Sequence, residues 1–189
     1  MVKKIKDPAA RSALLIVDMI SDFEFTDGEQ LFKHAVPAAD KIIKLKKRAQ
    51  GAGWPVIYVN DNYGRWQEDF AHQVTRIIKK KCLGREIAEM LRPGREDYYI
   101  LKPHRSGFYE TPLEVLLSSL GVGKVVITGV TTDICVLFTA HDADMRGLKV
   151  IVPEDCSAAV APTHHSSALA LLRRAAHTET TASAELETE

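Results

Sequence analysis

Continuous apolar runs alternate along the chain with segments whose apolar positions recur at helical spacing. Five runs stand out, namely ALLIVDM, VIYVN, YYILK, VVITG and KVIVP. Between and after them, the spacing predicts helices over about 36–50, within 66–92, from 111, around Cys135 and over about 163–177. Continuous apolar strands that alternate with helices are typical of parallel strands joined by helical crossovers. The pattern therefore predicts an α/β fold, a three-layer α/β/α sandwich with a mostly parallel central sheet.

The length of 189 residues fits one ordinary domain, so we expect a single domain over 1–189. Its last part, about 178–189, has no apolar periodicity and is expected to form a flexible tail. Lys+Arg and Asp+Glu are balanced at 25 each, which indicates neither a nucleic-acid partner nor an anionic membrane. The chain shows no membrane-spanning run and no secretory signal, so we expect a cytoplasmic protein that acts on a small molecule.

The three cysteines, Cys82, Cys135 and Cys156, form no CxxC motif or Cys/His cluster, so free thiols are expected. Cys135 differs from the other two because it follows an apolar strand and a short polar turn and enters a helix. Exposed N–H groups and the positive dipole end of a helix stabilise a thiolate and lower its pKa. Cys135 is therefore a candidate nucleophile, although a lone cysteine in an apolar helix is more often a small core residue.

Polar side chains also stand at the ends of other predicted strands, where ligands bind in open parallel sheets. Asp18 ends the first strand and Lys102 ends the third. A carboxylate can accept a thiol proton, and an ammonium lowers the pKa of a thiol, so the two residues would suit Cys135 in nucleophilic acyl transfer. Taken alone, Asp18 is more often a helix cap and Lys102 a solvated surface cation.

Three segments, in this order and spacing, resemble the isochorismatase-like cysteine hydrolase superfamily. They are LLIVDMISDF, LKPHRSGFYETPL, and VVITGVTTDICV followed by TAHDADMRGLKVIVPEDCSAA. The resemblance implies an Asp-Lys-Cys triad, which falls on Asp18, Lys102 and Cys135. It also implies a cis Val130–Thr131 peptide bond, an oxyanion hole made by the backbone N–H groups of Thr131 and Cys135, and a homo-oligomer.

The loop after the second strand departs from one branch of this superfamily. Nicotinamidases carry a metal-binding Asp-x-His there, whereas Asp61 of this chain is followed by Asn62 and Tyr63. We therefore expect no metal and no other cofactor. Many members also have a Gln two residues after the triad aspartate, where this chain has Ile20.

Aromatic and polar residues on the loops after the first three strands are candidates to contact substrate. For Trp66 and Phe108, ordinary packing is an equally good interpretation. The candidate substrate-binding residues are Phe23, Asn60, Tyr63, Trp66, Phe108, Tyr109 and Val130.

Three functions are compatible with these residues. The leading hypothesis is a metal-independent hydrolase that cleaves an amide, ureido or carbamoyl C–N bond through a thioester on Cys135. The second is a catalytically silent binding or scaffold protein with the same fold. The third, a thiol redox protein, lacks a resolving cysteine at short spacing.

Overall fold

A six-stranded parallel sheet forms the centre of the computed structural model, which describes residues 11–188. Its main strands lie in the order β3-β2-β1-β4-β5, and β6 pairs with the end of β4. The strands are β1 (Arg11–Val17), β2 (Val56–Asp61), β3 (Tyr98–Lys102), β4 (Val122–Val130), β5 (Lys149–Ile151) and β6 (Ser157–Ala158). All registered pairs are parallel, as the continuous apolar runs predict.

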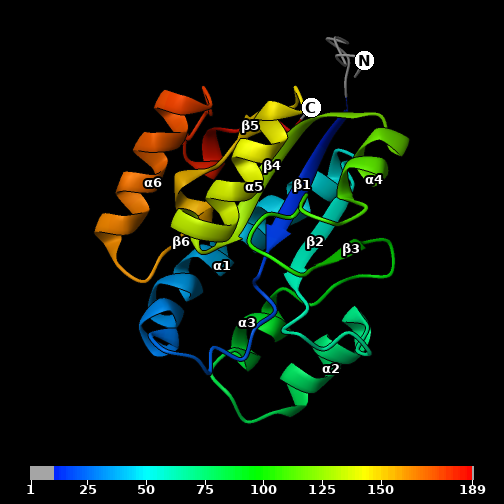
Figure 1. Cartoon of the computed structure of the whole chain (residues 1–189), viewed down its shortest axis with the longest axis vertical. Coiled ribbons are helices and arrows are strands. Elements are labelled where there is room, and N and C mark those ends of the chain that lie inside the picture. The colour runs from blue at the N-terminus through cyan, green and yellow to red at the C-terminus, as the bar shows by residue number, and fades with distance from the viewer. Residues whose placement is uncertain (1–10, 189) are drawn as a thin grey trace.

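Helices cover both faces of this sheet (Figure 1). One face packs against α1 (Gly28–Gly51), α2 (Phe70–Lys79) and α3 (Arg85–Met90), and the other against α4 (Leu113–Ser119), α5 (Leu137–Met145) and α6 (Pro162–Ala175). Alternate residues of β1 belong to different cores, because Leu14 and Ile16 pack in the first and Leu15 and Val17 in the second. The predicted three-layer sandwich is confirmed.

The direction of chain growth reverses between β1 and β4. From β1 the chain builds β2 and then β3 on one side, and it then crosses to build β4 and β5 on the other. Gly129 lies at the close contact between these two strands, with a φ of +111°. A Cβ at this position would lie 2.0 Å from the carbonyl oxygen of Val17, so only glycine fits. The carboxyl ends of β1 and β4 therefore border the crevice where open sheets bind ligands.

Helix α1 is longer than predicted. The sequence analysis expects it over about 36–50, whereas it begins at Gly28 and contains Pro37 within its length. Leu31 and Ala35 extend the buried face of the helix towards its start, on the N-terminal side of the proline. This earlier start brings the first turns of α1 to the carboxyl end of β1.

Residues 178–188 pack against the domain, so the predicted flexible tail is wrong for this segment. Glu179 forms a parallel bridge with Ile151, and the backbone N–H and hydroxyl of Ser183 donate to the Asp155 carboxylate at 2.7 and 2.9 Å. Leu186 is only 7% exposed and packs in the core that contains α1. Hydrogen bonds and one apolar anchor hold the segment, and neither produces a helical or strand period. Residue 189 lies outside the described residues.

None of the helices formed by residues 11–188 has the length and hydropathy needed to cross a membrane.

We expect Leu186→Ala to lower the free energy of unfolding by about 2 kcal/mol, because it empties a core position. Urea denaturation of the purified protein measures this change. Leu83→Ala is the matched control, since Leu83 is 42% exposed and its truncation should change stability by less than about 0.5 kcal/mol. Equal, small effects of both substitutions would contradict the packed segment.

Candidate active site

Cys135 lies in an irregular turn between β4 and α5. The Val130–Thr131 peptide bond is cis, and Thr132–Val136 forms a short π-helical turn that leads into α5. The Val136 N–H donates to the Thr131 carbonyl at 3.1 Å. Thr132 is fully buried, and its hydroxyl lies 2.8 Å from Nδ1 of His165 on α6. Cys135 is thus held within a π-helical turn, whereas the sequence pattern predicts the first turn of a regular helix.

Asp18 lies directly after β1, in a left-handed backbone conformation with a φ of 51°. Its N–H donates to the Val59 carbonyl at 3.0 Å. Its carboxylate accepts a 2.7 Å hydrogen bond from the Asp61 N–H and forms a 2.8 Å ion pair with the Lys102 Nζ. These contacts fix the carboxylate between the ends of β1, β2 and β3.

Lys102 is the last residue of β3 and is fully buried. Besides Asp18, its Nζ contacts the His104 carbonyl at 3.0 Å, the Cys135 Sγ at 3.6 Å and the Asp61 carboxylate at 3.6 Å. The structure therefore brings Asp18, Lys102 and Cys135 together, and the solvated surface cation considered as an alternative for Lys102 is wrong.

Burial and charge set the protonation of this cluster. Burial raises the pKa of Asp18 against the opposing effect of the Lys102 ammonium. Burial also raises the pKa of the Cys135 thiol, and the Asp18 charge adds to this rise while Lys102 opposes it. Burial acts to lower the pKa of Lys102, but the charges of Asp18 and Cys135 raise it overall. Burial and the Asp18 charge therefore act against the expected lowering of the thiol pKa.

A cavity of about 190 Å³ opens over Cys135. Three of the candidate substrate-binding residues, Phe23, Tyr63 and Val130, lie in its wall. The full lining consists of Asp18, Ser21, Phe23, Phe25, Leu31, Asp61, Tyr63, Val130, Thr131, Ile134 and Cys135. The cavity thus combines carboxylates with aromatic and aliphatic side chains.

Two other candidates have structural roles away from this cavity. Asn60 is fully buried, and its amide bridges the backbone N–H and carbonyl of Ile20 at 3.2 and 3.0 Å. It therefore holds the loop after β1 in place of contacting substrate. Phe108 is 5% exposed and packs in the core beneath the Arg146 guanidinium. The expectation of substrate contact is wrong for both residues.

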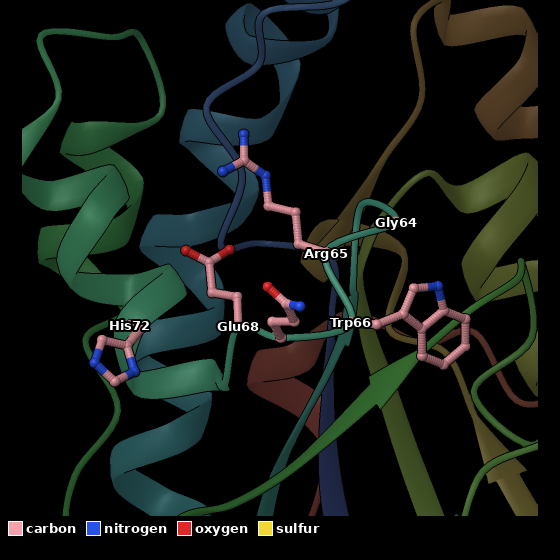
Figure 2. Close-up of a pocket in the computed structure, with 6 residues that line it drawn as sticks. Gly64, Arg65, Trp66, Glu68 and His72 are labelled. Atoms are coloured by element: carbon pink, nitrogen blue, oxygen red, sulfur yellow. The ribbon is translucent and has the colours of Figure 1, made fainter.

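The remaining two candidates line separate surface depressions. Tyr109 is half exposed, with its ring edge against His104. Trp66 is 78% exposed and lines a depression on the loop before α2, where its indole points away from Glu68 and His72 (Figure 2). Neither ring lies in the wall of the cavity over Cys135, and substrate contact by these two residues stays a prediction.

Five residues of the cavity were absent from the candidate set: Ser21, Phe25, Leu31, Asp61 and Ile134. Ile134 directly precedes the candidate nucleophile, so its sequence position was a usable signal. Leu31 reaches the cavity because α1 begins early, and no local signal in the sequence shows this.

The cavity wall does not fit the metal site of nicotinamidases. Tyr63 stands two residues after Asp61, where that motif places a histidine. The Tyr63 hydroxyl is buried beside Ser21 and Asp18, and burial raises its pKa, although the residue as a whole is 41% exposed. Within residues 11–188, His, Cys, Asp and Glu side chains form no group of three or more that could hold a metal ion.

Comparisons with known proteins identify relatives of this chain. The Isochorismatase domain model matches residues 12–183. The chain is 41% identical over 175 residues to the uncharacterized isochorismatase family protein YaaI of Bacillus subtilis, with coverage of 91% of this chain and 94% of that one. Streptothricin hydrolase of Streptomyces noursei is 31% identical over 150 residues, which is 77% of this chain and 54% of that protein. The structure of N-carbamoylsarcosine amidase from Thermoplasma acidophilum aligns with a TM-score of 0.70 and 29% identity, covering 94% of this chain and 99% of that one.

Because the Asp18 charge raises the pKa of the Cys135 thiol, Asp18→Asn should lower that pKa and speed alkylation by iodoacetamide several-fold at pH 8. Lys102→Met should slow alkylation, since the ammonium has the opposite effect. Mass spectrometry of the Cys135 peptide follows the rate. Alkylation that is unchanged in both variants would show that neither charge acts on the thiol.

Proposed function

This chain belongs to the isochorismatase family, and we propose that it is a cysteine hydrolase that cleaves a C–N bond in a small amide, ureide or carbamoyl compound. One observation carries the proposal: the Lys102 Nζ lies 2.8 Å from the Asp18 carboxylate and 3.6 Å from the Cys135 Sγ at the floor of a cavity. The names of two relatives, an N-carbamoylsarcosine amidase and a streptothricin hydrolase, support hydrolysis as the reaction class.

The first half of the proposed cycle forms a thioester. Asp18 accepts the Cys135 thiol proton as Sγ attacks the substrate carbonyl carbon, and the carbonyl electron pair moves to oxygen. The backbone N–H groups of Thr131 and Cys135 stabilise the oxyanion. The oxyanion then collapses, the C–N bond breaks, and Asp18 donates its proton to the leaving nitrogen.

The second half releases the acid. Asp18 takes a proton from water as the water oxygen attacks the thioester carbon, and the C–S bond breaks. The Cys135 sulfur leaves as a thiolate and recovers the proton from Asp18. Lys102 stays protonated throughout and stabilises the negative charge that passes between Asp18 and the sulfur. The balance is one water consumed, with one acid and one ammonia or amine formed, and no step calls for a metal or a cofactor.

The two alternative functions, a silent scaffold protein and a redox protein, differ from this proposal in the role of Cys135. A silent scaffold protein of the same fold would keep the cluster without turnover. Slow thiol labelling does not separate the two, because burial raises the pKa of the Cys135 thiol in either case. A redox function is disfavoured because Cys156 packs in the core on one face of the sheet and Cys135 packs against the other.

The α5 helix leaves large apolar side chains exposed, with Phe138 at 48% and Met145 at 74%. Exposed apolar surface of this kind marks interaction sites in many proteins. This surface and the family relationship support a homo-oligomer as part of the proposal.

Cys135→Ala and Asp18→Asn should each lower kcat on a turned-over amide by about 10³-fold or more, because each removes a group that takes part in bond making or proton transfer. Released ammonia measures turnover in a panel of small amides, ureides and carbamoyl compounds. Cys82→Ala is the matched control and should retain activity, since Cys82 lies outside the cavity. Full turnover by Cys135→Ala would overturn the mechanism.

The dependence of kcat/KM on pH should reflect the ionisation of Asp18. The carboxylate must be ionised to accept the thiol proton, and burial raises its pKa above the ordinary value of 3.8. The acid limb of kcat/KM should therefore lie above pH 3.8, with activity lost as pH falls through it. Lys102→Met removes the charge that lowers the Asp18 pKa and should move the limb to higher pH. An acid limb at or below 3.8 would exclude Asp18 as the base.

A further inference from the structure

The floor of the cavity carries more negative than positive charge. Asp18 and Asp61 both line it, and Lys102 is the cation beside them. Lys102 is fully buried and paired with both carboxylates, at 2.8 and 3.6 Å. While Cys135 is a thiol, two carboxylates therefore face one ammonium.

Two more carboxylates, Asp22 and Glu24, neighbour the cavity-lining residues Ser21 and Phe23 in the chain. Lys80 pairs with Asp22 at 3.1 Å and with Glu24 at 2.5 Å. Burial is the main cause that raises the pKa of the Tyr63 hydroxyl, and the charges of Asp18, Asp61 and Asp22 add to this rise. These carboxylates outnumber the lysine that pairs with them, so the local charge is again negative.

The other cations nearby do not line the cavity. Arg76 forms two hydrogen bonds to Glu68, at 2.8 and 2.9 Å. Arg65 lines the neighbouring depression with Trp66, and its guanidinium extends away from that ring (Figure 2). Among the described residues that line the cavity over Cys135, none is an arginine, lysine or histidine. A substrate carboxylate would therefore find no cation to pair with among these lining residues.

The rest of the wall is apolar. Phe23 and Phe25 stack with ring centroids 6.2 Å apart, and Val130 and Ile134 lie in the same wall. Phe25 is 49% and Ile134 40% exposed, so apolar surface is open to a ligand. A cavity of about 150 Å³ holds a benzene ring. The volume of about 190 Å³ therefore suits one ring or a short branched chain beside the amide.

We infer that the substrate is a neutral or cationic amide that carries an apolar ring or chain and no carboxylate, with Asp61 as the residue that sets this charge preference. The inference rests on the proposed function for the reaction itself. A carboxylate placed beside Asp61 would lose its water and meet a like charge, which costs binding energy. An ammonium there would gain an attractive partner, and a neutral ring would gain burial against Phe25 and Ile134.

Three ligands of matched shape test the inference: benzamide, 3-(aminomethyl)benzamide and 3-carboxybenzamide, which are neutral, cationic and anionic at pH 7. Binding to the Cys135→Ala protein is measured by calorimetry, so that the result does not depend on turnover. We expect the neutral and cationic compounds to bind at least about tenfold more tightly than the anion. Asp61→Asn in the same background should reduce the ratio of cation to anion affinity by about tenfold, and Arg65→Gln should leave it unchanged.

Several results would overturn the inference: equal or tighter binding of the anion, no binding by any of the three compounds, or a ratio that Asp61→Asn does not change. Turnover by the wild-type protein is measured separately. Preferred hydrolysis of anionic compounds such as N-carbamoylsarcosine would overturn the charge preference and leave the proposed function intact. If the three compounds bind in the expected order but the wild-type protein hydrolyses no compound of the wider amide panel, the charge preference stands and the proposed function is overturned.

Discussion

The buried ammonium of Lys102 is the constraint on which the site depends. A cation at 0% exposure is stable only when anions and hydrogen-bond acceptors surround it. Asp18, Asp61 and the His104 carbonyl supply these partners, and they come from the ends of three adjacent strands. Strand register therefore determines the geometry of the site as well as the packing of the sheet. Pairing of Asp61 with Lys102 across β2 and β3 places the cation where the thiol also reaches it.

The sequence predicted the layer architecture and the central cluster because both follow from local pattern. Continuous apolar runs mark strands that are covered on both faces, and a polar residue at the end of such a run lies at one known edge of a parallel sheet. Asp18 and Lys102 meet Cys135 for this reason. No knowledge of distant contacts was required, because topology alone brings the strand ends together.

Properties that depend on side-chain direction or long-range burial were not predictable in this way. Trp66 and Phe108 both follow strands, yet one points into solvent and the other into the core. The short strand β6 and the packing of Leu186 depend on contacts with distant segments. The thiol pKa depends on how completely the rest of the chain covers Cys135, because burial is the largest cause of its rise.

The protonated state of Cys135 also bears on the durability of the protein. Peroxides oxidise the thiolate of cysteine far more readily than the thiol, and each further oxidation step beyond sulfenic acid is hard to reverse. Partial burial raises the pKa of the Cys135 thiol, so little of this sulfur is thiolate that such oxidants can attack. The burial that raises this pKa thus also slows the oxidation of the nucleophile.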